Sequence, residues 1–366
     1  MAERQHGLLK YTEKHMEMSH TLAHLANRWV LKNPNLELIP NSEDYPWFVV
    51  ELQRQLKALD SRGELLLPNL QNDNESIAIF SDYGGESKDA KYHTYSFLIC
   101  AWNQLDPFLM AMGQLRKQTG LDNPLKEIAY KDLHYGPVQR ALTGYLNHLS
   151  NFVNGLLLTV VVDKDVGSVY GTDKKNSQQF IARTLFDHGF GELKPAVAEK
   201  MMRIVHFSAY LVALLSRDGQ KIFWMTDHDS IAPNSERHMQ TLSIFNSHLA
   251  HYSKHGFSMV GGALPFVERL PMWLDLLSAP DIVAGSVEHY MSRRKIFGEQ
   301  FTITEHCNRV LTWLAVQGIG LKRHTVIIRK ERQGVVSSTL KFILKEPLLN
   351  ANVVPVFMPR RPEKLG

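Results

Sequence analysis

The chain has 366 residues, of which 44% are hydrophobic and 21% charged, a composition that excludes a disordered or fibrous protein. The N-terminal segment mixes charges and histidines with apolar residues, and no stretch approaches the roughly 18 apolar residues of a membrane span. The two cysteines, Cys100 and Cys307, cannot alone build a disulfide framework or a thiolate metal site. We therefore expect a cytoplasmic protein that does not bind membranes and whose thiols are buried.

Positive charge gathers at the C-terminal end of the chain. Residues 293–366 hold 14 Lys and Arg against 5 Asp and Glu, which leaves a net charge of −5 on the first 292 residues. Such a basic region is a candidate surface for polyanions, nucleic acid above all. The alternative is a basic face that only keeps the protein soluble.

The first part of the chain predicts a helical layer and then a β-hairpin. Apolar residues recur at helical intervals over 47–59 and at Leu8, Leu9, Tyr11, Met16, Leu22 and Leu25. The apolar run 76–82 and the aromatic-rich run 92–102 flank a segment rich in turn residues. These two runs predict a pair of antiparallel strands.

Helices and strands alternate after the hairpin. The patterns predict helices at 106–118, from 136 onward, and over 176–217, with strands at 127–133, 156–163 and 222–226. Further on we expect helices at 236–253, 281–294 and 303–317, an apolar loop at Gly261-Gly262, and a last hairpin of 322–331 and 335–345. No repeat or flexible linker interrupts the sequence, so one elaborated domain is favoured.

Three predicted strands end in aspartate, at Asp82, Asp163 and Asp227. A carboxylate at the end of a buried strand is held rigidly but can still reach a metal ion, and oxygen ligands suit Mg²⁺ or Mn²⁺. Several such carboxylates together can bind the ions that assist phosphodiester cleavage. The alternative is that aspartate is simply a common turn residue after a strand.

Three segments carry a resemblance to a known family. IAIFSDYGG, EIAYKDLHYGPVQRAL and APDIVAGSVEHY, taken in this order, resemble the motifs of the bacterial family catalogued as domain of unknown function 3800, which is regarded as ribonuclease-H-like. The resemblance covers roughly residues 76–294. It implies an α/β fold with a mixed five-stranded sheet flanked by helices, to which this chain adds an N-terminal helical layer and a C-terminal β-hairpin. We divide the chain into a helical extension (1–70), a core with a helical insertion near 171–217 (71–300), and a basic helix and hairpin (301–366).

The resemblance also implies a set of site residues. The acids of the family fall on Asp82, Glu127, Asp227 and Asp281, and a lysine of the family falls on Lys131. The chain departs from the family pattern in two places. Tyr83 follows the first aspartate, so that the second acid of this motif is Glu86, and residues 278–280 replace a glutamine that often precedes the last aspartate.

Other acids compete for the same roles. Asp229 lies two residues beyond Asp227, and Asp163 ends a strand expected to lie beside the first, although its neighbour Lys164 could neutralise it. Glu288 is a further candidate, because Asp281, Ala284, Gly285 and Glu288 share one helix face whose small residues allow close packing. Asp281 could instead complement the helix dipole in a first turn.

These observations favour a metal-dependent nuclease, or a nuclease-like protein, that uses Mg²⁺ or Mn²⁺ and acts on nucleic acid. The basic C-terminal part would hold the strand. The sequence does not choose between DNA and RNA, and it leaves a homo-oligomer or a protein partner open. The resemblance associates the chain with antiviral defence or mobile elements. The alternative is a non-catalytic module that binds nucleic acid or protein on the same fold.

Overall fold

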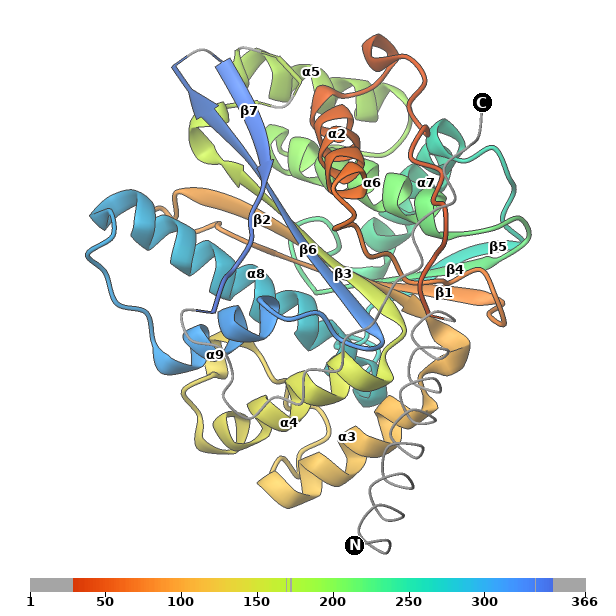
Figure 1. Ribbon diagram of the computed structural model, residues 1–366. Coiled ribbons are helices and arrows are strands. Elements are labelled where there is room, and N and C mark those ends of the chain that lie inside the picture. The colour runs from red at the N-terminus through yellow and green to blue at the C-terminus, as the bar shows by residue number, and fades with distance from the viewer. Residues whose placement is uncertain (1–28, 169, 172, 333, 345–366) are drawn as a thin grey trace, which may run out of the picture.

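The computed structural model describes residues 29–168, 170–171, 173–332 and 334–344 (Figure 1). The helices are α2 (Trp47–Ser61), α3 (Asp106–Thr119), α4 (Gly136–Phe152), α5 (Lys174–Asp187), α6 (Pro195–Leu215), α7 (Ser235–Tyr252), α8 (Pro271–Phe297) and α9 (Glu305–Leu314). The strands are β1 (Ser76–Gly84), β2 (Tyr92–Ala101), β3 (Gly155–Asp163), β4 (Lys221–Thr226), β5 (Met259–Ala263), β6 (Leu321–Glu331) and β7 (Gly334–Thr339).

The seven strands form one mixed sheet in the order β5-β4-β1-β2-β3-β6-β7. β2 runs antiparallel to β1 and β3, and β7 runs antiparallel to β6, whereas the pairs β1-β4, β4-β5 and β3-β6 are parallel. The first five strands alone have the order β3-β2-β1-β4-β5 with β2 reversed. The chain therefore has a ribonuclease-H-like α/β fold, as the sequence predicts.

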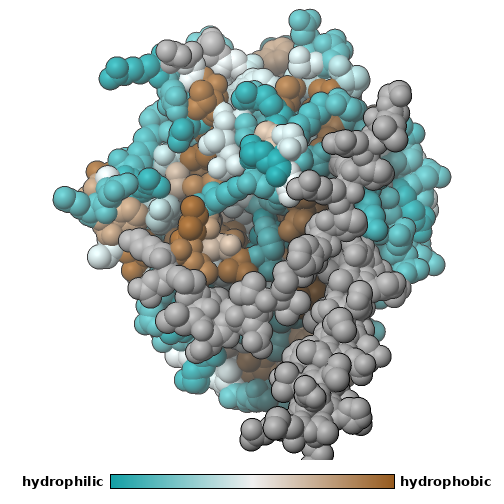
Figure 2. Space-filling view, viewed as in Figure 1, coloured by the Kyte–Doolittle hydropathy of each residue, from teal (hydrophilic) through white to brown (hydrophobic). Residues whose placement is uncertain are grey.

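Helices cover both faces of the sheet, with α2, α6 and α7 on one side and α3, α4, α8 and α9 on the other (Figure 1). Successive residues of a strand point to opposite faces, so Ile79 packs into the first core and Phe80 into the second. Burial on both faces accounts for the continuous apolar run in β3, all of whose residues are buried. On the surface seen in Figure 2, hydrophilic and hydrophobic side chains are interspersed.

Most predicted elements are confirmed. The β1-β2 hairpin forms, α3, α4, α7 and α9 lie where the sequence predicts them, and α2 supplies the N-terminal helical layer. The predicted helix over 176–217 is two helices, α5 and α6, separated by a turn with Gly189 and Gly191 at positive φ. The apolar pattern from Leu8 to Leu25 lies outside the described residues.

The segment 127–133 is not the strand that the sequence predicts. It contains only the 3₁₀ turn η3 (Tyr130–Asp132), and the Tyr130 backbone N–H donates to Asp281 Oδ2 of α8 at 2.8 Å. Side chains of α8 accept hydrogen bonds from backbone N–H groups of this segment, so the segment needs no partner strand. A short run of apolar residues does not distinguish these two arrangements.

The sheet has seven strands where the sequence predicts five. The expected loop at Gly261-Gly262 is the edge strand β5, and a Cβ added at Gly262 would lie 2.3 Å from the Trp224 carbonyl oxygen of β4. These glycines therefore permit close pairing of strands, although the pattern is typical of a turn. The expected C-terminal hairpin forms as β6 and β7 and joins the same sheet through β3.

Helix α8 begins ten residues before the predicted start at residue 281. Pro271 occupies the first turn and Pro280 lies inside the helix, so the sequence signal of a proline before Asp281 marks no boundary. Asp281 consequently lies in mid-helix. The helix dipole, which acts within the first turn, does not account for it.

Both cysteines are free and buried, as expected. Among the described helices, none combines the length and apolar character needed to cross a membrane.

Candidate carboxylate site

The strand register brings Asp82 and Asp227 together. β1 and β4 are parallel and paired up to Ser81 and Thr226, so these two aspartates are the next residues on neighbouring strands. One oxygen of each is held by the backbone N–H of the following residue, Asp82 Oδ1 by Tyr83 at 2.6 Å and Asp227 Oδ1 by His228 at 2.7 Å. The neighbouring strands β1 and β4 thus present two carboxylates at the carboxyl-end side of the sheet.

Helix α8 adds Asp281 because it packs closely over β1 and β2. A Cβ added at Gly84 would lie 2.5 Å from Thr94 Oγ1 and 3.4 Å from the Ala284 carbonyl oxygen, and Thr94 Oγ1 donates to that oxygen at 3.2 Å. The absence of a side chain at Gly84 leaves room for the Thr94 hydroxyl, which ties β2 to α8. Asp281 lies about one turn before Ala284 and so reaches the same carboxyl-end side of the sheet.

Glu127 comes from a segment docked against α8. The Ile128 backbone N–H donates to Ser278 Oγ at 3.2 Å, and a Cβ added at Gly285 would lie 2.3 Å from the Tyr130 ring. The expectation that small residues on this helix face allow close packing is thus confirmed. Ser278 is one of the residues that depart from the family pattern, and here it anchors the segment that carries Glu127.

Arg116 of α3 fixes the residues that precede Glu127. Its Nη1 is 2.6 Å from Asp275 Oδ1 of α8, and its Nη2 donates to the Lys126 carbonyl oxygen at 2.6 Å. The segment before Glu127 is therefore held to α3 and α8 by a buried ion pair. No sequence motif identified this contact.

We call Asp82, Glu127, Asp227 and Asp281 the carboxylate cluster. Burial, followed by the charges of Asp281 and Asp227, raises the pKa of Asp82 well above its usual value. Burial and the same two neighbours, Asp227 first, raise the pKa of Glu127 to about 7. Burial, with Asp227 as a further cause, raises the pKa of Asp281 to about 6. The four acids thus lie close enough to repel one another in a poorly solvated site.

No member of the cluster forms an ion pair with a described Lys, Arg or His side chain. Asp82, Asp227 and Asp281 each have one oxygen bound by a backbone N–H and a second oxygen without a described hydrogen-bond partner. Lys131 is exposed, and its charge lowers the pKa of Glu127 and Asp281 without reaching ion-pair distance.

The donors suit Mg²⁺ or Mn²⁺ chemically, since carboxylate oxygens are the ligands that these ions prefer. Within the described ranges, however, no three His, Cys, Asp or Glu side chains are placed to share one ion. A bound ion would therefore have to draw the carboxylates of the cluster together.

Asp163 is separate from the cluster. It ends β3, but β2 lies between β3 and β1, so the expectation that its strand lies beside the first is wrong. Both oxygens of Asp163 accept hydrogen bonds from Lys295 Nζ, at 2.7 and 2.8 Å. Lys164, the expected neutralising partner, donates instead to the Ser87 carbonyl oxygen at 2.9 Å.

The other two secondary candidates have different surroundings. Asp229 adds to the charges that raise the pKa of Asp82, but its own carboxylate is bound by Lys200 Nζ at 2.6 Å. Glu288 accepts a hydrogen bond from Ser292 Oγ and lines a separate cavity of about 430 Å³ beside the β1-β2 turn.

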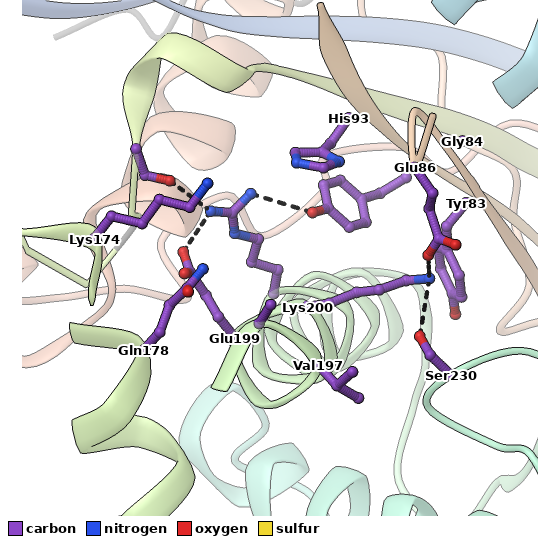
Figure 3. Close-up of a pocket in the computed structure, with 14 residues that line it drawn as sticks. Tyr83, Gly84, Glu86, His93, Lys174, Gln178, Val197, Glu199, Lys200 and Ser230 are labelled. Atoms are coloured by element: carbon purple, nitrogen blue, oxygen red, sulfur yellow. Dashed lines mark hydrogen bonds and ion pairs between the residues drawn. The ribbon is translucent and has the colours of Figure 1, made fainter. Parts of the chain in front are cut away.

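Lys200 is a residue of this region that the sequence reasoning missed. It extends from α6 between Glu86 and Ser230 and lies over the ring of Tyr83 (Figure 3). Through Glu86 and Asp229 it ties the chain after β1 to the chain after β4. The sequence does not indicate these contacts of Lys200, because a single lysine in an apolar helix does not predict partners that are distant in the sequence.

A cavity of about 260 Å³ lies beside Lys200, on the α6 face of the sheet, and Lys174, Arg203 and His93 also line it (Figure 3). It is not the carboxylate cluster: Tyr83 lines it, whereas the preceding residue, Asp82, points to the α8 face. Burial, then the charges of Arg203 and Lys164, lowers the pKa of His93 to about 3.

Comparisons with known proteins add one distant likeness. No protein-family model matches the sequence, and no curated protein matches it. Among solved structures, the chain is similar to the ribonuclease H2 from Pyrococcus horikoshii OT3, with 10% sequence identity, a TM-score of 0.31, and 65% of this chain and 85% of that chain covered. The fold assignment rests on the order and direction of the strands and not on this likeness, and the resemblance to domain of unknown function 3800 stays a prediction.

Proposed function

We propose that this protein is a divalent-metal-dependent nuclease whose carboxylate cluster holds Mg²⁺ or Mn²⁺. The observation that carries the proposal is that four partly buried acids repel one another and have no cationic partner among the described residues. Other buried acids of the chain are paired, Asp275 with Arg116 and Glu199 with Arg203. Uncompensated carboxylates at the carboxyl-end side of a rigid sheet are typical of a site that takes its positive charge from a metal ion.

Asp82, Glu127, Asp227 and Asp281 would hold the divalent ion, which would supply a water of lowered pKa and would stabilise the charge on the entering and leaving oxygens of a phosphodiester. The protein contributes orientation. Backbone N–H groups hold one oxygen of Asp82, Asp227 and Asp281, which leaves the second oxygen of each for the ion. Lys131, whose charge acts on Glu127 and Asp281, would contact the phosphate as a point charge.

A second candidate is a module that binds nucleic acid or protein without cleaving it. Two observations favour this alternative. The described carboxylates are not drawn together to hold one ion, and Tyr83 follows Asp82 where the family motif has an acid. The two candidates differ in metal-dependent cleavage and share the fold.

The test is cleavage of single- and double-stranded DNA and RNA in Mg²⁺ or Mn²⁺ by the wild type, Asp82→Asn, Asp227→Asn and Asp163→Asn. We expect the first two variants to lose cleavage, because each removes a metal ligand. Asp163→Asn is the matched control, since it removes a strand-end aspartate that Lys295 already neutralises, and it should keep cleavage.

Cleavage that survives Asp82→Asn rejects the proposed site. Binding of nucleic acid without cleavage of any substrate, together with no stabilisation by Mg²⁺ or Mn²⁺, supports the non-catalytic module.

A further inference from the structure

Arg323, near the start of β6, is a buried cation for which the described residues supply no carboxylate. The residue is only 4% exposed. Burial lowers the pKa of Arg323 to about 9, and no nearby acid acts to raise it. A buried charge is costly unless it is paired, so this arginine needs an explanation.

Among the described residues, the other buried arginine, Arg203, is paired, and so is the partly buried Arg116. Arg116 Nη1 lies 2.6 Å from Asp275 Oδ1, and Arg203 binds Glu199 on the same helix. Arg323 therefore differs from the other described arginines that are buried or partly buried.

The contacts of Arg323 leave one edge of its guanidinium free. The guanidinium carbon lies 4.1 Å from the centre of the Trp313 ring, and Nη1 donates to Ser150 Oγ at 3.1 Å. Nε is buried without a hydrogen-bond partner, and Nη2 makes no hydrogen bond to a described residue. Nε and Nη2 belong to the rigid donor fork that binds two oxygens of a phosphate or carboxylate at once.

Arg323 lines a cavity of about 240 Å³ between the start of β6 and the chain that follows β7, which we call the Arg323 pocket. Gln317, Thr325 and Thr339 also line it. Gln317 is already bonded to the Arg323 backbone, whereas neither threonine hydroxyl makes a hydrogen bond to a described residue. The pocket thus combines two threonine hydroxyls with a guanidinium whose Nε and Nη2 have no described hydrogen-bond partner.

At the rim of the pocket, Lys341 lies beside a carboxylate, that of Glu64. Lys341 Nζ lies 2.5 Å from Glu64 Oε1, but Glu64 also accepts from Arg62 Nε at 2.7 Å. Lys341 thus shares Glu64 with Arg62, which lies outside the lining of the pocket, and Arg323 has no carboxylate partner among the described residues.

We propose that the Arg323 pocket binds a phosphate group. A tetrahedral phosphate presents more oxygens than a carboxylate and can use the guanidinium edge, the hydroxyls and Lys341 together. The volume lies below the roughly 300 Å³ at which pockets for whole small molecules begin, so the pocket fits a phosphate and not a complete nucleotide.

We assign this phosphate to a nucleic-acid strand, because Arg323 lies in the basic C-terminal part of the chain that the sequence predicts to hold one. Arg323 is opposite Leu157 of β3, and Asp82 is opposite Ser96 of β2, which places the two residues three strands apart and about 15 Å from each other along the sheet. Assignment of the phosphate to a strand rests on the proposed function. The phosphate site itself does not.

The first test uses the full chain in EDTA, so that it does not depend on cleavage. We measure the thermal unfolding midpoint against inorganic phosphate, with chloride at matched ionic strength as the reference. The wild-type midpoint should rise with phosphate concentration, because a ligand that binds only the folded state stabilises it. Arg323→Met should lose this rise.

Lys322→Met is the matched control. Lys322 is also 4% exposed and has no described carboxylate, but its Nζ donates to the Gly318 and Ile319 carbonyl oxygens and it does not line the pocket. This variant should respond to phosphate as the wild type does. Lys341→Gln, at the half-exposed rim, should weaken the response and serves as a second variant where Arg323→Met folds poorly.

A second arm identifies the source of the phosphate. Binding of a fluorescent single-stranded oligonucleotide is followed in EDTA over a range of salt concentrations. Weaker binding by Arg323→Met, with a salt slope reduced by about 1, assigns the pocket to a strand phosphate. Equal binding of the oligonucleotide, together with a lost response to inorganic phosphate, assigns it to a free phosphate compound. The proposal is overturned if phosphate stabilises Arg323→Met as much as the wild type, or if Lys322→Met loses the response equally.

Discussion

At the scale of single residues, the carboxylate cluster resists deprotonation in the metal-free protein. Glu127 is the clearest case, because burial and the charges of Asp227 and Asp281 raise its pKa to about 7 from an ordinary value of 4.5. The folded state therefore holds the Glu127 proton more tightly than the unfolded state does. The contribution of Glu127 to the free energy of unfolding is therefore fully present below pH 4.5 and is lost as the pH rises through about 7.

This shift predicts how Glu127→Gln changes stability. The variant should be more stable than the wild type at pH 8 by on the order of 3 kcal/mol, because it removes a charge that the folded state disfavours. The advantage should disappear near pH 4. Urea unfolding of both proteins in EDTA at the two pH values measures the difference, and a difference independent of pH would contradict the assigned environment.

Single residues were the most predictable part of the site. The sequence predicts that Asp82 and Asp227 end buried strands; in the structure Asp82 lies near the end of β1, Asp227 follows β4, and the two are neighbours across the strand pair. Asp163 has the same sequence signature but is neutralised by Lys295, a contact set by packing of α8 against β3. Lys200 and Arg323 were not predictable as special, because burial of a cation is decided by the tertiary fold.

At the scale of elements, the docking of residues 127–130 on α8 is the contact that completes the cluster. It depends on Gly285, since a Cβ at this position would lie 2.3 Å from the Tyr130 ring. The sequence indicated close packing on this helix face. It did not indicate that the partner is an irregular segment, because α8 side chains replace the hydrogen bonds that a strand would have made.

Gly285→Ala should therefore push the segment away from α8. We expect a loss of about 1–3 kcal/mol of unfolding free energy and weaker cleavage, because both Glu127 and the Tyr130 bond to Asp281 shift. Gly113→Ala is the matched control: Gly113 is also helical, a Cβ there meets nothing within 4 Å, and the change should be neutral or stabilising by up to about 1 kcal/mol. Equal effects of the two substitutions on stability would rule out the close contact as the cause.

At the scale of the whole molecule, elements from the two ends of the chain meet on one side of the sheet. Gln55 Nε2 of α2 donates to the Ser337 carbonyl oxygen of β7 at 3.2 Å and to Ser337 Oγ at 2.8 Å. The sequence predicted α2 and the last hairpin but not this contact, since periodicity reports on one segment at a time. The proposed segments 1–70, 71–300 and 301–366 divide the sequence, but the strands of the last two segments belong to one continuous sheet.

Continuity of the sheet predicts that β6 and β3 unfold together. Backbone N–H groups of 326–328 in β6 should exchange with solvent as slowly as those of 160–162 in β3, because β6 is paired on both of its edges. Native-state hydrogen exchange in low denaturant measures both sets. Early loss of protection in β6 alone would indicate an independent C-terminal unit.

Neighbouring side chains of β1 point to opposite faces of the sheet and contribute to two different sites, which limits insertions and deletions within this strand. Asp82 faces α8 and the carboxylate cluster, whereas Tyr83 faces α6 and the cavity beside Lys200. Deletion or insertion of one residue within β1 would exchange these faces and put a tyrosine ring into the cluster and a carboxylate against Tyr95. Within the β1-β2 hairpin, we therefore expect variation in length to be tolerated in the exposed turn at residues 86–89.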